Sequence, residues 1–510
     1  MNFSSESKKL SFCETVLETT AEQSLEADIT LPDYCPEIRK ILKCSVCPQI
    51  ISVQSSSGRI TAQGNALVKI IYVGDNDKTV SFEQSYPVQK AVDSDSLNAD
   101  SNAEVRINVD YVNSRAVSAR RIDIRAMLTF VFKSEKKGEE TVLCSADGCG
   151  IQCRNTEHNY ANLSGLCTKA FNLTEVIEIS SDKNPVSQIV NASAFAVAKD
   201  IKIINNKILI KGDCEIKIHY LSENKDSIDC VEHSIPISQI IEVDGVTEDC
   251  ISSLCLKVTS CETVGKVDSS GGMRLIDIAV RVCACFASYN EISLNLISDA
   301  YSTSNELKNT FKSLEINSLN TSFDTTFINK VVIESIGVSV ESILGVWCDD
   351  IRYTSALKGD SCVINGTYRA TVIYRDADKQ TGVIHKPVDF EYSFNLKKPA
   401  SRINSRVSLQ IAACSCSLSG ESKLEIKTEI SACGIILSNE IVKYISDIDV
   451  LDECTNTENA CALTIYFSDE NEKVWNIAKK YKTTVNAIMQ ENDLDSETIE
   501  TRRFLLIPAV

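Results

Sequence analysis

Apolar and polar positions alternate along three stretches of the chain, which follow one another at intervals of about 150 residues. Each stretch begins with Gly and ends eight positions later with Tyr ("GNALVKIIY", residues 64–72; "GDCEIKIHY", 212–220; "GTYRATVIY", 366–374). A period of two predicts a β-strand with one buried face. We expect the Gly to begin the strand, at a turn or a close backbone approach, and the ring of Tyr220 to cover the edge of a core.

Other features recur at the same interval. A polar turn follows each Tyr, and a Pro stands at a similar distance beyond it (Pro87, Pro236 and Pro387). Recurrence of this kind predicts three copies of one domain. The predicted fold class is mainly β, with three tandem domains of short antiparallel strands, each a sandwich or a partly closed barrel. Alternation alone favours neither of the two.

The expected divisions of the chain follow from this repeat. We place an N-terminal segment and three β domains at residues 1–27, 28–153, 184–290 and 330–450. The segments 154–185 and 290–330 are rich in Ser, Asn and Thr, so we interpret them as connections. Short helices are predicted for "EIRKIL" after Pro36 and for "SNELKNTFKSL" at residues 304–314.

Residues 462–510 have a different pattern. The strand-like "ALTIYFS" and "FLLIP" enclose two stretches in which apolar residues recur at helical spacing, first in "VWNIAKKY" and then in "VNAIMQEN". Thr484 is the expected N-cap of the second helix. The predicted order is βααβ. We expect Trp475 to pack against the core or its rim rather than to form a platform for a sugar.

These features together resemble a known family. The motif "LPDYCPEIRKIL" (residues 31–42), the Gly-to-Tyr strand and the terminal βααβ module are similar to the SPOCS-domain proteins of spore-forming bacteria, in particular the SipL type, which ends in a LysM domain. The resemblance implies a role in building the spore coat around the forespore, on its mother-cell side. It implies a cytoplasmic protein at the forespore surface, which agrees with an N-terminus that does not read as a signal peptide.

The LysM resemblance also suggests where a ligand would bind. Glycan-binding LysM modules open with a loop like Gly-Asp-Thr-Leu and have Gly-Gln before the last strand, whereas charged residues occupy most of these positions here. The candidate binding residues are those of the loops at this end of the module: Asn471, Glu472, Lys473, Asn492, Asp493, Leu494, Arg502 and Arg503. Mixed charges around Leu494, which we expect to be exposed, favour a protein partner. The resemblance implies that this partner is a coat morphogenetic protein. The alternatives are a peptidoglycan-binding protein, which would take polymers of N-acetylglucosamine, and a purely structural cap.

Composition narrows the function classes. A net charge of −18 argues against nucleic acid and anionic lipid as partners, and no apolar run reaches the length of a transmembrane segment. The four His residues form no catalytic motif, so we expect no enzymatic activity and no cofactor. The alternative from this function class is a metal-dependent enzyme that uses the cysteine-rich segment beginning at Cys144. The best metal candidate has ligands at a spacing that is not standard for zinc: Cys144, Cys149, Cys153 and His158, with Cys167 beyond. We therefore expect no metal, and expect most of the 22 cysteines to be free thiols.

Overall fold

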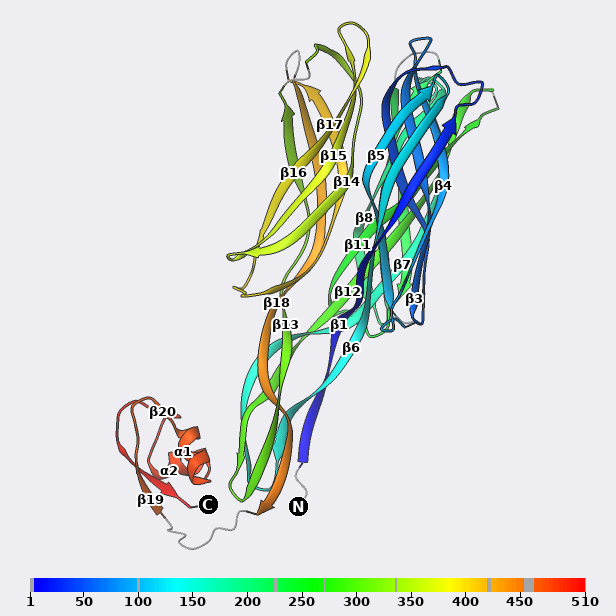
Figure 1. Ribbon diagram of the computed structural model, residues 1–510. Helices are drawn as coiled ribbons and strands as arrows, with labels where there is room; N and C mark the ends of the chain where they lie inside the picture. Colours follow the sequence, from blue (N-terminus) through cyan, green and yellow to red (C-terminus); the bar gives the residue numbers. More distant parts are fainter. Residues whose placement is uncertain are drawn as a thin grey trace.

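The computed structural model describes residues 4–98, 101–223, 228–269, 271–334, 337–419, 423–453 and 463–509. Long antiparallel strands form most of the molecule, and a small module with two helices lies at one end (Figure 1). The mainly β fold class is confirmed.

Three units with one strand order make up the β part. Unit 1 contains β1 (Ser4–Thr30), β2 (Ile38–Ser56), β3 (Arg59–Gly74), β4 (Thr79–Asp93), β5 (Asn102–Ser118) and β6 (Arg121–Asp147). Unit 2 contains β7 (Ile151–Glu178), β8 (Val186–Ile204), β9 (Lys207–Ser222), β10 (Ile228–Glu242), β11 (Ile251–Val267) and β12 (Met273–Ser302). Unit 3 contains β13 (Asn305–Ile333), β14 (Val340–Lys358), β15 (Ser361–Asp376), β16 (Thr381–Asn395), β17 (Ile403–Leu418) and β18 (Leu424–Glu453).

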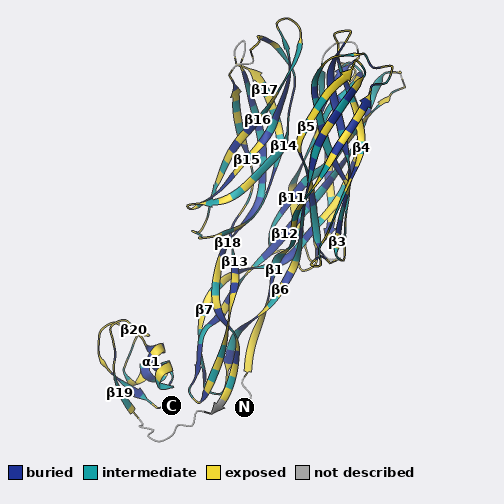
Figure 2. Ribbon diagram, in the orientation of Figure 1, coloured by how far each residue is buried: buried dark blue, intermediate teal, exposed yellow. Residues whose placement is uncertain are grey.

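Each unit is a sandwich of two three-stranded sheets. In unit 1 the sheets have the orders β2-β3-β4 and β1-β6-β5, and units 2 and 3 repeat both orders with their own strands. One apolar core lies between the two sheets of each unit. Buried and exposed residues alternate along the strands, as the sequence pattern requires (Figure 2).

The repeated Gly and Tyr have different structural roles. The Tyr220 ring is buried in the core of unit 2 and its hydroxyl donates to the Asn184 carbonyl at 3.4 Å, which confirms the expected packing of this ring. Gly212 does not begin its strand but lies inside β9. A Cβ there would collide with the Val197 carbonyl of the neighbouring strand, near a break in the β8–β9 register. The Gly thus permits a close backbone approach at a bulge.

Beyond the sandwiches, the longest strands continue together as a stalk. The pairs β1/β6, β7/β12 and β13/β18 all extend into it (Figure 1). Its largest core contains side chains from all three units: Leu10, Val142, Tyr160, Leu294, Leu296, Leu314, Ile316 and Tyr444. The Tyr160 hydroxyl of unit 2 donates to the Ser11 carbonyl of unit 1 at 3.2 Å. No unit could bury its part of the stalk alone.

The stalk corrects several sequence predictions. The expected N-terminal segment 1–27 is not separate, because Ser4–Thr30 pairs along β6. The expected connections lie largely within β7, the end of β12 and β13, and residues 305–314 extend along β18 instead of forming a helix. "EIRKIL" likewise starts β2, where Ile41 faces Tyr72 across the ladder. Pairing with a neighbouring strand overrides the weak local preference in each case.

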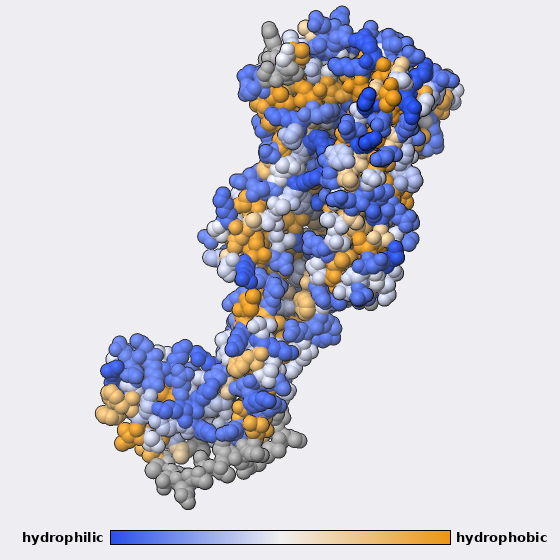
Figure 3. Space-filling model, viewed as in Figure 1, coloured by the Kyte–Doolittle hydropathy of each residue, from blue (hydrophilic) through white to orange (hydrophobic). Residues whose placement is uncertain are grey.

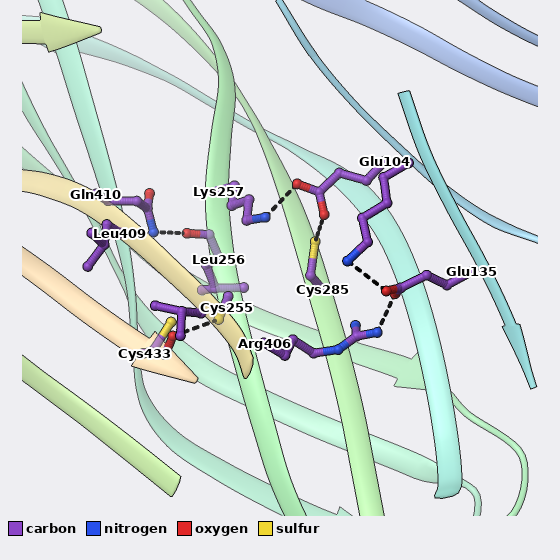
Figure 4. A network of polar contacts seen from close by, with 12 residues as sticks. Glu104, Glu135, Cys255, Leu256, Lys257, Cys285, Arg406, Leu409, Gln410 and Cys433 are labelled. Carbon is purple, nitrogen blue, oxygen red and sulfur yellow. Dashed lines mark hydrogen bonds and ion pairs between the residues drawn. The ribbon is translucent and has the colours of Figure 1, made fainter. Parts of the chain in front are cut away.

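Half-buried charge pairs join the units (Figure 4). Lys257 of unit 2 pairs with Glu104 of unit 1, and Arg406 of unit 3 pairs with Glu135 of unit 1. The Gln410 side-chain amide of unit 3 donates to the Leu256 carbonyl of unit 2. Every pair of units is therefore joined by at least one polar contact.

The C-terminal module has the predicted βααβ order with an additional short strand pair. Its elements are β19 (Leu463–Phe467), β20 (Glu472–Lys473), α1 (Val474–Tyr481), α2 (Val485–Glu491), β21 (Thr498–Ile499) and β22 (Phe504–Pro508). Thr484 caps α2, since its hydroxyl accepts from the Ala487 backbone N–H at 3.1 Å. The predicted first and last residues, Ala462 and Val510, lie outside the described residues.

Candidate functional site

The first candidate loop of the C-terminal module is held by its own hydrogen bonds. Asn471 adopts a left-handed backbone conformation (φ 61°), and its N–H donates to the Ile499 carbonyl at 2.7 Å. The Glu472 carboxylate accepts from the Tyr466 hydroxyl and from the Asp469 N–H, both at 3.0 Å. Glu472 therefore braces the loop, and Lys473 is exposed beside it.

The second candidate loop is braced by Asn492. Its side-chain amide donates to the Leu506 carbonyl at 2.6 Å and to the Ile488 carbonyl at 2.8 Å, and its oxygen accepts from the Leu506 N–H at 2.6 Å. These bonds fix β22 against α2. Most of the polar capacity of Asn492 is thus committed to the fold, which accounts for this Asn without a ligand.

The remaining candidates divide into surface charges and one core residue. Arg502 forms an ion pair with Asp469 at 3.0 Å, and Arg503 donates to the Asn492 carbonyl at 3.3 Å. Asp493 is exposed. Leu494 was expected to be exposed, but it is half-buried and packs against the core of the module. A module this small needs most of its apolar side chains for its core, which explains why Leu494 packs inward.

The outer face of β19 and β22 is an apolar surface that the sequence pattern was not expected to form. Directly paired residues of the two strands, Phe467 with Phe504 and Ile465 with Leu506, lie on this face. The side chains of Ile465 and Phe504 are 68% and 70% exposed, and the rings of Phe467 and Phe504 are 4.9 Å apart. Figure 3 shows hydrophobic surface on this side of the module. We call Leu463, Ile465, Phe467 and Phe504 the outer apolar face.

One signal in the sequence could have revealed this face. A half-buried strand alternates between apolar and polar residues, but "LTIYF" and "FLLIP" have apolar residues in both phases. Tyr466 and Leu505 fill the inward phase and pack in the module core. The apolar residues that point outward are therefore not needed to fill the core of the module.

The opposite side of the module is seated on the end of the stalk. The Trp475 indole N–H donates to the Asp299 carboxylate at 2.8 Å, and the Tyr301 hydroxyl donates to the Thr483 carbonyl at 2.7 Å. The rings of Tyr301 and Trp475 meet edge to face, 5.0 Å apart. Trp475 thus has the packing role expected from sequence.

Asp299 is the polar centre of this seat. Burial raises its pKa, but hydrogen bonds from Lys479 and Trp475 outweigh burial and hold the pKa below its ordinary value. Asp299 is therefore ionised at neutral pH and attracts both donors. The contact leaves the outer apolar face uncovered.

Within the described part of the chain, no three His, Cys, Asp or Glu residues are grouped so that they could hold a metal ion. Among the candidates, Cys167 belongs instead to the core of unit 2. The described residues also include no helix with the length and apolar character required to cross a bilayer.

Two family models match parts of the chain. The model described as SipL, SPOCS domain, matches residues 37–117 and 185–264, and the LysM domain model matches residues 470–508. The first two segments correspond to β2–β5 and β8–β11, and β14–β17 of unit 3 have the same order. Neither the curated proteins nor the solved structures gave a match.

Proposed function

We propose that this chain, which contains SPOCS domains of the SipL type and a C-terminal LysM domain, is a non-enzymatic assembly protein of the spore envelope. In this proposal the three β units form a scaffold, and the LysM domain binds a protein component of the coat. The protein acts at the forespore surface, from the cytoplasm of the mother cell.

The outer apolar face is the observation that carries the proposal. Monomeric proteins seldom leave several large apolar side chains together in water, and such groups mark interaction sites. Aromatic residues are enriched at the centres of protein interfaces, where they supply much of the binding energy. Phe467 and Phe504, already in contact, are suited to that role.

Open strand edges add a second means of recognition. β19 and β22 form a two-stranded sheet, and in the described part of the chain neither pairs with a third strand. An extended segment of the partner can therefore pair with one edge while its apolar side chains cover the outer face. The proposed ligand is thus a coat protein that presents an apolar strand.

The alternative is binding to peptidoglycan, which the match to the LysM domain favours. Asn471 keeps the left-handed conformation that a loop Gly would supply, so the backbone of the loop is compatible with a sugar groove. Against this alternative, Glu472 is committed to internal hydrogen bonds and Arg502 to an ion pair. Trp475 faces the stalk and not a groove.

A paired substitution tests the proposal. Ile465→Asp with Phe504→Asp adds two charges to the outer apolar face. Asn476→Asp with Asn486→Asp adds the same charge at exposed helix positions and serves as the matched control. The full chain is used for affinity capture from sporulating cells, followed by identification of coat components, and for sedimentation with purified peptidoglycan.

We expect the control to retain the coat component and the variant of the outer apolar face to lose it, with little sedimentation of either protein. Strong sedimentation of the wild type, together with normal capture by the variant of the outer apolar face, would establish the glycan alternative instead. Circular dichroism and melting curves show whether each variant is folded.

A further inference from the structure

Two cysteines from different units face each other where units 2 and 3 meet. Cys255 lies on β11 and Cys433 on β18, separated by 178 residues of sequence. The Cys255 thiol points to the Cys433 backbone carbonyl, with 3.9 Å between sulfur and oxygen. Figure 4 shows both residues beside the charge pairs that join the units.

The alternation of each strand explains why these thiols meet. Leu254 and Leu256 enter the core of unit 2, so Cys255 between them points out of the unit. Ala432 enters the core of unit 3, so Cys433 likewise points outward. The outward faces of β11 and β18 pack against each other, so Cys255 is buried and Cys433 is half-buried.

The surrounding contacts hold the two strands in place. Close by, Gln410 of unit 3 donates to the carbonyl of Leu256, the residue that follows Cys255. Lys257, two residues after Cys255, pairs with Glu104 of unit 1. The thiols are thus carried by two rigid sheets that are already joined, which limits the entropy lost when a bond forms between them.

The two thiols also differ in acidity. The Cys433 thiol, as a hydrogen-bond donor to the Cys255 sulfur, lowers the pKa of Cys255 despite burial, and Lys257 lowers it further. The same hydrogen bond and burial raise the pKa of Cys433. Cys255 is therefore the better source of thiolate, the form that reacts with peroxides.

We propose that Cys255 and Cys433 are an oxidation site, at which hydrogen peroxide converts the two thiols into a disulfide bond that joins unit 2 to unit 3. Hydrogen peroxide is close to water in size, so it can reach a thiol that is buried between the units. The Cys255 thiolate attacks one peroxide oxygen, which breaks the O–O bond, releases hydroxide and leaves a sulfenic acid on Cys255. Cys433 then loses its proton and attacks the Cys255 sulfur, which forms the S–S bond and releases the sulfenic oxygen as water. Two protein thiols lose two electrons and two protons, and the peroxide gains them as two molecules of water.

A competing partner for Cys255 is Cys285. It faces Cys255 directly across the β11–β12 ladder, but its thiol is directed to the Glu104 carboxylate of unit 1, with 3.7 Å between sulfur and oxygen. A bond to Cys285 would also remain within unit 2 and would not join two units. The geometry favours Cys433.

Oxidation of the full chain tests the proposal. Fully reduced protein is incubated anaerobically with hydrogen peroxide, quenched in acid, alkylated and analysed by non-reducing electrophoresis and peptide mass mapping. We expect a cross-linked peptide that contains Cys255 and Cys433. The oxidised chain migrates faster because the bond closes a large loop, and its melting temperature rises by several degrees until a reductant is added.

Cys433→Ser should remove the cross-link, the faster migration and the rise in melting temperature. Cys261→Ser, on the same strand as Cys255 but packed against the core of unit 2, is the matched control and should retain all three. Recovery of Cys433 as the alkylated thiol in folded, oxidised wild type, or a cross-link of Cys255 to Cys285, would overturn the proposal. Because this mapping uses the wild type, it decides the question even if a variant fails to fold.

Discussion

Trp475 donates its indole N–H to Asp299 at 2.8 Å, across 176 residues of sequence, so the LysM domain is seated on the end of β12. We expect Asp299→Ala to weaken the contact between the LysM domain and the stalk by about 2 kcal/mol, the typical contribution of a hydrogen bond to a charged group. Trp475 should then become more exposed, and its fluorescence should shift to longer wavelength. Asp447→Ala, at an exposed position of β18, is the control. An unchanged emission spectrum of the Asp299 variant would contradict this contact between the LysM domain and the stalk.

Tyr220→Ala should destabilise the chain by about 3 kcal/mol in urea unfolding, because it empties a fully buried site in unit 2. Tyr220→Phe keeps the ring and loses only the 3.4 Å bond to the Asn184 carbonyl, so it should cost roughly 1 kcal/mol or less. If both variants fold as stably as the wild type and lose function, Tyr220 is a contact residue and not a core residue.

Acidification should destabilise the fold through His219. Burial, and then the charge of Lys217, lower the pKa of His219 from 6.5 to about 4. Between these two values the unfolded chain binds a proton that the folded chain does not. Stability is therefore lost as pH falls from 6.5 towards 4, by roughly 3 kcal/mol for this group. His219→Gln should show a smaller loss between pH 7.5 and pH 4.5 in urea unfolding. Equal losses in both proteins would show that His219 does not carry this dependence.

Leu494→Asp should lower the melting temperature of the LysM domain, since this half-buried side chain packs on the domain core; the cost should be about 2 kcal/mol. Lys473→Glu at an exposed position should change the stability by no more than about 0.5 kcal/mol. Calorimetry of the full chain separates the two effects. An unchanged melting curve for Leu494→Asp would restore Leu494 as an exposed contact.

The sequence predicted the antiparallel β-strands well because each core strand has one clear apolar face, but it did not decide between a sandwich and a barrel. The strand from Gly212 to Tyr220 is an example, as is the Thr484 cap in the LysM domain. The stalk could not be predicted in the same way. The Tyr160 hydroxyl reaches the Ser11 carbonyl only when units 1 and 2 pack together. Neither the burial of Tyr160 nor this hydrogen bond therefore leaves a pattern in the nearby sequence.

The candidate site was predicted in part for a similar reason. Spacing correctly placed Val474 and Ile477 in the domain core, but it could not distinguish an inward Leu494 from an outward one in a short loop. The surplus apolar residues Ile465 and Phe504 are visible in the sequence. Their exposure becomes evident only once the structure shows that the neighbouring residues of each strand, Tyr466 and Leu505, already face the core.

The stalk also determines how many LysM domains each rod carries. Three copies of a separate protein could form a similar bundle, but each copy would then present the same end and would seat its own LysM domain. Here a single chain supplies all three positions, and only the end of β12 carries Asp299 and Tyr301, which hold the LysM domain. The fusion of three units thus gives a rod with a three-fold arrangement of units but only one LysM domain, at its tip.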